Sequence, residues 1–239
     1  MSEIPAGQPR TNRGMHALYL MGAIVALSVV FAGFAKTYFL KGAFGTPSLT
    51  PLVHLHGFVM TTWFLLFFVQ TWLVASHRVA LHRKLGMFGA FWAIVLVVVG
   101  VTTAIAAAGL GHSPGPPPLQ FLVVPLGDML VFSVLVSLGL AFRSNRETHR
   151  RLMLLTALGI LTAAIARIPL AFIHKGGIPV YFGITDLILI TAVLIDTIKF
   201  RRLHPAFLWG TLFIIASQPL RLMLSGTELW MRFAHWAVG

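Results

Sequence analysis

Cysteine is absent from the 239 residues of the chain, which excludes disulfides, thiolate metal sites, iron–sulfur clusters and cysteine nucleophiles. Carboxylates are scarce, because only six Asp and Glu residues accompany 18 Lys and Arg residues. The sequence also lacks a Walker loop, a GxSxG or HExxH motif and a dinucleotide-binding fingerprint. No catalytic residue follows from a motif, so the sequence leaves open whether the protein is an enzyme.

What the chain has instead is apolar residues, which make up 57% of it, while charged residues make up 10%. Such a composition is typical of a protein whose main solvent is lipid. The formal net charge of +12 could point to nucleic acid. The basic residues stand at the ends of apolar runs, however, where they anchor membrane helices. We therefore expect the lipid bilayer, and not nucleic acid, as the partner of this chain.

The apolar residues fall into long runs, and a transmembrane helix needs about 20 predominantly apolar residues. Connections rich in proline, glycine or arginine separate the runs. The pattern predicts an all-α, polytopic membrane protein, a bundle of seven transmembrane helices. The predicted spans are 16–40, 52–75, 86–109, 120–142, 152–173, 180–198 and 206–225.

The basic residues also predict the orientation of the bundle. Twelve of them fall at the N-terminus and in alternate connections, and far fewer fall on the other side. The positive-inside rule places the richer side in the cytoplasm. We therefore expect a multi-pass protein of a bacterial inner membrane with a cytoplasmic N-terminal tail (1–15), a transmembrane domain (16–225) and a periplasmic C-terminus. Residues 226–239 are expected to form an amphipathic segment in the outer interface.

Ionisable residues inside the spans predict where a site lies, because such residues usually face the interior of a bundle. Asp128, Arg167, Asp186 and Arg221 all fall in the outer half of the predicted bundle. The simplest arrangement pairs the two aspartates with the two arginines. These pairs either fix the helices structurally or also contact a ligand. Asp196, near the inner end of its span, is expected to pair with Lys199 or Arg201.

Histidines add candidate ligands on both sides of the membrane. His54 and His56 lie at the outer start of the second span, but residues two apart point about 200° away from each other on a helix. Only one of them at a time is therefore expected to bind a metal or haem, with His174 as a further metal ligand. On the inner side, His77, His82 and His149 could offer two histidines to a haem.

The stretches FAGFAKTYFLKGAFGTPSLTPLVHLHG, RVALHRKLG and ETHRRLMLL give the chain a resemblance to uncharacterised multi-pass bacterial inner-membrane proteins. That resemblance implies a fold but no activity. The LHRKLG loop is also similar to loops of small haem proteins and ferric-reductase-like membrane proteins, which implies redox chemistry without assigning a residue.

Two functions follow as hypotheses. In the first, a buried polar site in the periplasmic half binds a divalent metal, haem or a small ligand for redox chemistry, sensing or transfer. Its candidate residues are His54, His56, Asp128, Arg167, Asp186 and Arg221. In the second, the protein is a non-catalytic accessory or scaffold subunit of a larger membrane complex, and the buried charges are structural ion pairs.

Overall fold

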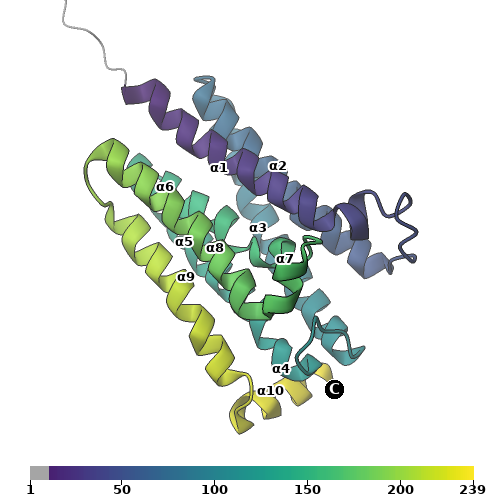
Figure 1. Ribbon diagram of the computed structural model, residues 1–239. Coiled ribbons are helices and arrows are strands. Elements are labelled where there is room, and N and C mark those ends of the chain that lie inside the picture. The colour runs from purple at the N-terminus through teal and green to yellow at the C-terminus, as the bar shows by residue number, and fades with distance from the viewer. Residues whose placement is uncertain (1–10) are drawn as a thin grey trace, which may run out of the picture.

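The computed structural model describes residues 11–239, and their side chains from Ala17 onward, as helices and connections with no strand among them (Figure 1). Most of the predicted N-terminal tail lies outside the described residues, and the first helix begins at Thr11. The elements are α1 (Thr11–Phe34), the π-helix η1 (Ala35–Phe39), α2 (Pro51–Ala75), α3 (Val79–Gly109), α4 (Pro118–Phe121), α5 (Val123–Ala141), α6 (Arg146–Gly159), α7 (Thr162–Ile165), α8 (Ala171–Phe200), α9 (Pro205–Leu224) and α10 (Glu228–Val238).

Six segments of the described chain are long and apolar enough to cross a membrane, which confirms the prediction of an all-α membrane protein. Their boundaries follow local chemistry. At the start of α2, for example, Pro51 occupies the first turn, where its missing N–H costs nothing, and Thr50 Oγ1 accepts a hydrogen bond from the Val53 N–H. The six segments are 17–39, 51–75, 79–109, 118–141, 171–200 and 205–224.

The predicted span 152–173 is not one continuous helix. Helix α6 ends at Gly159, α7 covers only Thr162–Ile165, and an irregular connection follows it. Pro169 explains part of this break, because a proline disfavours helical backbone at the residue before it. Nearly every residue of α6 from Arg151 to Gly159 is buried, so this helix lies in the centre of the bundle and not against lipid.

Helices α6 and α7 follow α1 closely along its length. A Cβ atom added to Gly22 would lie 2.7 Å from a methyl carbon of Leu154, and one added to Gly33 would lie 2.1 Å from the Ala164 carbonyl oxygen. At Gly33 the contact is with backbone, and only glycine allows two backbones to approach this closely, whereas the contact at Gly22 is with a side chain. The two contacts place the middle of α6 beside the middle of α1, and α7 beside the last turn of α1.

Helix α8 contains a kink where the sequence predicts a break before residue 180. Gly177 has φ 61° and ψ −153°, a conformation that essentially only glycine adopts, and Pro179 follows it two residues later. The kink separates a short first segment of α8, which contains His174, from the long apolar segment that contains Asp186 and Asp196.

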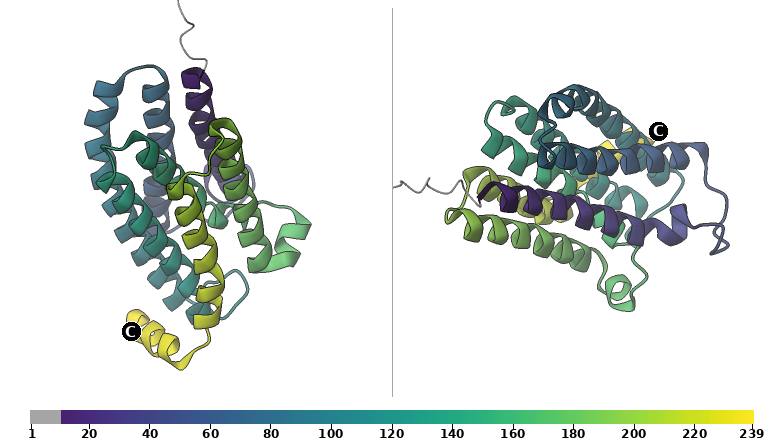
Figure 2. Two further views of the ribbon diagram at one scale, coloured as in Figure 1. Left: turned by 90° about the vertical axis from the view of Figure 1, so that its left-hand side faces the viewer. Right: turned by 90° about the horizontal axis from the view of Figure 1, so that it is seen from above.

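The bundle has two chemically different ends. The start of α1 lies at one end and α10 at the other (Figures 1 and 2). We call the first the arginine-rich end, and it includes Tyr19, Arg151 and Asp196, whose side chains contact one another. The second, the C-terminal end, includes α10, whose Trp230 Nε1 donates a hydrogen bond to the Leu119 carbonyl at 2.8 Å.

Candidate functional site

Asp128 and Arg221 form an ion pair between α5 and α9 near the C-terminal end, as predicted for two of the four charges. Arg221 Nη1 lies 2.5 Å from Asp128 Oδ1, and the two side chains are only 8% and 13% exposed. Arg221 also donates hydrogen bonds to the Val124 carbonyl and to Ser217 Oγ. Gly127 makes room for it, because a Cβ atom there would lie 2.1 Å from Arg221 Cδ. The guanidinium is therefore held on several sides.

Asp186 is not paired with an arginine in the described part of the chain. Its Oδ1 accepts a hydrogen bond from Gln218 Nε2 at 2.7 Å, so a neutral amide on α9 takes the place that the sequence assigns to a cation. Gln218 lies one turn before Arg221 on α9. One face of α9 thus supplies a polar partner to Asp128 on α5 and to Asp186 on α8, and these contacts connect the three helices.

Arg167 has no carboxylate partner among residues 17–239, so the predicted pairing of both arginines with aspartates is wrong for this residue. Its Nη1 donates a hydrogen bond to the Ala163 carbonyl at 2.8 Å, and its guanidinium carbon lies 5.0 Å from the centre of the Phe34 ring. The residue is exposed and lies in the connection between α7 and α8. It is close enough to His56 for its positive charge to act on that ring.

The histidines that the sequence singles out separate as the helical geometry predicts. Helix α2 is regular through both of its histidines. His54 is exposed and lies near Tyr38, with ring centroids 5.9 Å apart, whereas His56 is half-buried. The Nδ1 atom of His56 is buried and has no hydrogen-bond partner. His174 is exposed in the first turn of α8.

No three His, Asp or Glu side chains within the described residues gather in a way that could hold a metal ion. The metal site predicted at His54, His56 and His174 stays a prediction.

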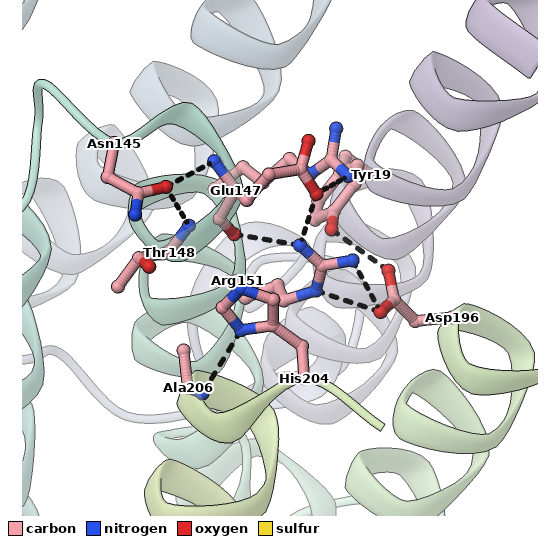
Figure 3. A network of polar contacts seen from close by, with 9 residues as sticks. Tyr19, Asn145, Glu147, Thr148, Arg151, Asp196, His204 and Ala206 are labelled. Carbon is pink, nitrogen blue, oxygen red and sulfur yellow. Dashed lines mark hydrogen bonds and ion pairs between the residues drawn. The ribbon is translucent and has the colours of Figure 1, made fainter. Parts of the chain in front are cut away.

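A second polar network, at the arginine-rich end, is one that the sequence does not reveal (Figure 3). Arg151 and Asp196 are both fully buried, and Arg151 Nε lies 2.8 Å from Asp196 Oδ2. Tyr19 Oη donates to the other oxygen of Asp196 at 3.2 Å, and Arg151 Nη1 donates to Glu147 Oε2 at 2.7 Å. The expected pairing of Asp196 with Lys199 or Arg201 is therefore wrong.

The reason for this error is distance along the chain, since Arg151 and Asp196 are 45 residues apart. Spacing along one helix considers only cations within one or two turns of Asp196. The sequence signal that could have found the pair was depth in the membrane, because Arg151 and Asp196 are both predicted near the cytoplasmic side. A buried aspartate is stabilised more strongly by a buried cation than by an exposed cation, because water screens the exposed cation.

Two groups at the edge of this network have shifted pKa values. Burial raises the pKa of Glu147, but the hydrogen bond from Arg151 and the charge of Arg150 outweigh it, so the net pKa lies below the usual value. Burial, together with the charges of Arg151 and Arg202, lowers the pKa of His204. A lowered pKa favours the neutral imidazole, and this form suits the role of His204 as the cap of α9, where Nδ1 accepts the Ala206 N–H at 3.1 Å.

His82 and His149 meet between α3 and α6 at the same end. Their ring centroids lie 6.4 Å apart, with the ring planes at 79°. His149 Nδ1 lies 2.7 Å from the Gly139 carbonyl oxygen, which leaves Nε2 available. His82 has the backbone of Gln70 as one partner, whereas its Nδ1 is buried and has none. Each imidazole is thus positioned by a backbone group and keeps one unused nitrogen.

No protein-family model matches the chain, and no curated protein and no solved structure matches it either. The fold and the polar sites therefore rest on the described geometry, which defines a helical integral membrane protein with a few buried ion pairs.

Proposed function

We propose that the chain crosses the membrane seven times, with α6 and α7 together as the fifth crossing. The support is their course beside α1: Arg151 lies near Tyr19 at one end, and Arg167 lies against Phe34 at the other. Seven crossings put the termini on opposite sides. The positive-inside rule then gives a cytoplasmic arginine-rich end and a periplasmic C-terminus in a bacterial inner membrane.

We further propose that the protein binds a small anionic ligand, a carboxylate or a phosphate, at Arg167 and His56 in the outer half of the bundle. The observation that carries this proposal is the lack of a carboxylate for Arg167. All five carboxylate residues in the described part of the chain already have side-chain partners, and none of these partners is Arg167. A guanidinium at membrane depth is costly without an anion, so a ligand supplies the missing charge.

The two residues divide the work of recognition. Arg167 presents a planar guanidinium that binds carboxylate or phosphate oxygens through paired N–H groups. His56 offers its unpartnered Nδ1, which donates a hydrogen bond in the tautomer that protonates it. Asp128, Arg221 and Asp186 are engaged with protein partners, so we assign them to holding α5, α8 and α9 in place around the site.

The test compares anion binding by matched variants of the purified protein in detergent. Inorganic phosphate and a small dicarboxylate should raise the melting temperature of the wild type. Arg167→Gln should weaken their binding about tenfold or more, the usual cost of a charge-assisted hydrogen bond, and His56→Gln should weaken it less. The control, Arg232→Gln, removes an exposed arginine at the same end. Equal binding by Arg167→Gln and the control refutes the proposal.

A second candidate function is electron transfer through a haem held by His82 and His149. It is favoured by their ring separation of 6.4 Å and by the backbone contact of each ring, an arrangement common around ligating histidines. The haem would supply one-electron redox chemistry. The nearby charge of Arg83 would suit its propionate groups better than a bare metal cation.

Visible spectra of oxidised and dithionite-reduced protein test this candidate, and elemental analysis of the same sample tests the metal predicted at His54, His56 and His174. A Soret band that disappears in His82→Ala and in His149→Ala, but not in His235→Ala, supports the haem. A colourless wild-type protein, purified after growth with added haem precursor, counts against it.

The interhelical ion pairs also favour a purely structural role, in which the protein is an accessory subunit of a membrane complex. Extraction in a gentle detergent tests this reading. A stoichiometric partner supports it, whereas a monomer at all concentrations contradicts it.

A further inference from the structure

An apolar groove opens on the surface of the bundle between α5, α6 and α9. Its volume is about 650 Å³. The apolar walls include Leu138 and Phe142 from the α5 side and Trp209 and Phe213 from α9, and all four side chains are 38% exposed or more. Such a surface lies within the predicted membrane, so its neighbours there are lipid chains.

The groove is polar at one end only. Asn145, Thr148 and His204 line it where α6 and α9 begin, at the arginine-rich end. The apolar lining extends along α9 from Pro205 to Phe213, which is roughly 12 Å of helix. An apolar groove of this length with a polar mouth has the polarity of a site for part of one acyl chain and its headgroup.

The mouth is also strongly basic. Arg143 and Arg146 flank Asn145, and Arg201 and Arg202 precede His204; all four are exposed. No carboxylate of residues 17–239 pairs with any of these four arginines, because Glu147 is bound to Arg150 and Arg151. The Oδ1 atom of Asn145 caps α6, which leaves its amide N–H groups for an acceptor.

We infer that this groove binds one anionic phospholipid, with an acyl chain between α5 and α9 and the phosphate among the arginines at the mouth. Charge complementarity selects the headgroup, since each basic residue near an anionic leaflet adds about 1 kcal/mol of attraction. The site is separate from Arg167 and His56, which lie at the C-terminal end, so this inference does not depend on the proposed anion site.

The test is native mass spectrometry of the full-length protein, delipidated and titrated with phosphatidylglycerol or phosphatidylcholine. We expect one phosphatidylglycerol to bind about tenfold more tightly than phosphatidylcholine, since charge-assisted hydrogen bonds are worth that much. Excess inorganic phosphate should not displace it, because the acyl chain contributes to binding.

Two pairs of matched variants locate the site. Val134→Trp should fill the groove and abolish tight binding, whereas Val98→Trp, on the lipid-facing surface of α3, should not. Replacing Arg143, Arg146 and Arg202 together by glutamine should remove the preference for phosphatidylglycerol. The control replaces three basic residues of the α2–α3 region at the same end, Arg78, Arg83 and Lys84, and should keep it.

Each outcome decides the inference. Equal binding of the two lipids overturns the role of the arginines, and unchanged binding in Val134→Trp overturns the location. A dimer that depends on Val134 and carries no lipid would show that a second copy of the chain occupies the groove. A melting curve of each variant, compared with that of its control, establishes that the protein still folds.

Discussion

Asp196→Asn is the substitution that tests most directly how the buried network at the arginine-rich end stabilises the protein. Both charged partners are fully buried, and Arg151 lies 2.8 Å from the carboxylate. Removing one partner of such a pair typically costs roughly 3–5 kcal/mol, because the remaining charge is left uncompensated in a poorly polarisable environment. Glu147 still contacts Arg151 in the variant, so we expect the low end of this range, about 3 kcal/mol.

Thermal unfolding in detergent, followed by circular dichroism and tryptophan fluorescence, measures this change. For a chain of this size, about 3 kcal/mol corresponds to a fall of roughly 6–12 °C in Tm. Glu228→Gln is the matched control, because it removes a carboxylate from the exposed ion pair with Arg232, and exposed pairs contribute little. Its Tm should not change measurably.

A combined variant separates the ion pair from the packing around it. Replacing Arg151 by Met and Asp196 by Leu removes both charges and should recover most of the stability that Asp196→Asn loses. If Asp196→Asn melts within about 2 °C of the wild type, less than the shift expected for 1 kcal/mol, the pair is hydrated in solution and the reasoning is refuted.

Three further predictions concern other parts of the bundle. In the absence of any ligand, Arg221→Gln should lower Tm because it leaves the buried Asp128 without its cation. Arg167→Gln should leave Tm equal or higher because it removes an uncompensated charge. A lower Tm in both variants would contradict this distinction. Gly33→Val should destabilise the protein by at least about 1–3 kcal/mol in the same melting assay, since its Cβ would collide with a carbonyl of α7. Because the pKa values of Glu147 and His204 are lowered on folding, the folded state binds fewer protons than the unfolded state. The contribution of each residue to stability should therefore be complete above the pKa that the residue has in the unfolded chain. It should be lost on acidification, below pH 6.5 for His204 and below pH 4.5 for Glu147. Melting curves across this pH range should show a smaller loss of stability when both residues are replaced by glutamine.

The fold was largely predictable because lipid leaves few alternatives to a helix. A run of about 20 apolar residues has to satisfy its backbone internally, and six such runs are membrane-length helices in the structure. The run 152–173 differs because Pro169 interrupts it and α6 is enclosed by other helices. Hydropathy reports how apolar a segment is, but not whether its neighbours are lipid or protein.

The polar sites were less predictable, since ion pairing depends on contacts between distant segments. The pair of Asp128 with Arg221 follows from counting charges at one depth. Counting charges does not find Gln218, which is neutral but supplies the hydrogen bond that Asp186 requires. Counting also does not find Arg151 as a partner, because it stands in a run of arginines that resembles an interfacial anchor. Only the packing of α6 against α8 buries it.

The scarcity of carboxylates connects these observations. Residues 4–127 contain no Asp or Glu, so every acidic partner in the described bundle comes from Asp128 or later. Asp128 and Asp196 neutralise Arg221 and Arg151, the two most deeply buried arginines among residues 17–239. Arg167 lies instead against α1 and α2, the part of the bundle without acidic residues. None of the Asp and Glu residues in the described part of the chain pairs with Arg167, and for this reason the proposed anion binding is expected to depend on this residue.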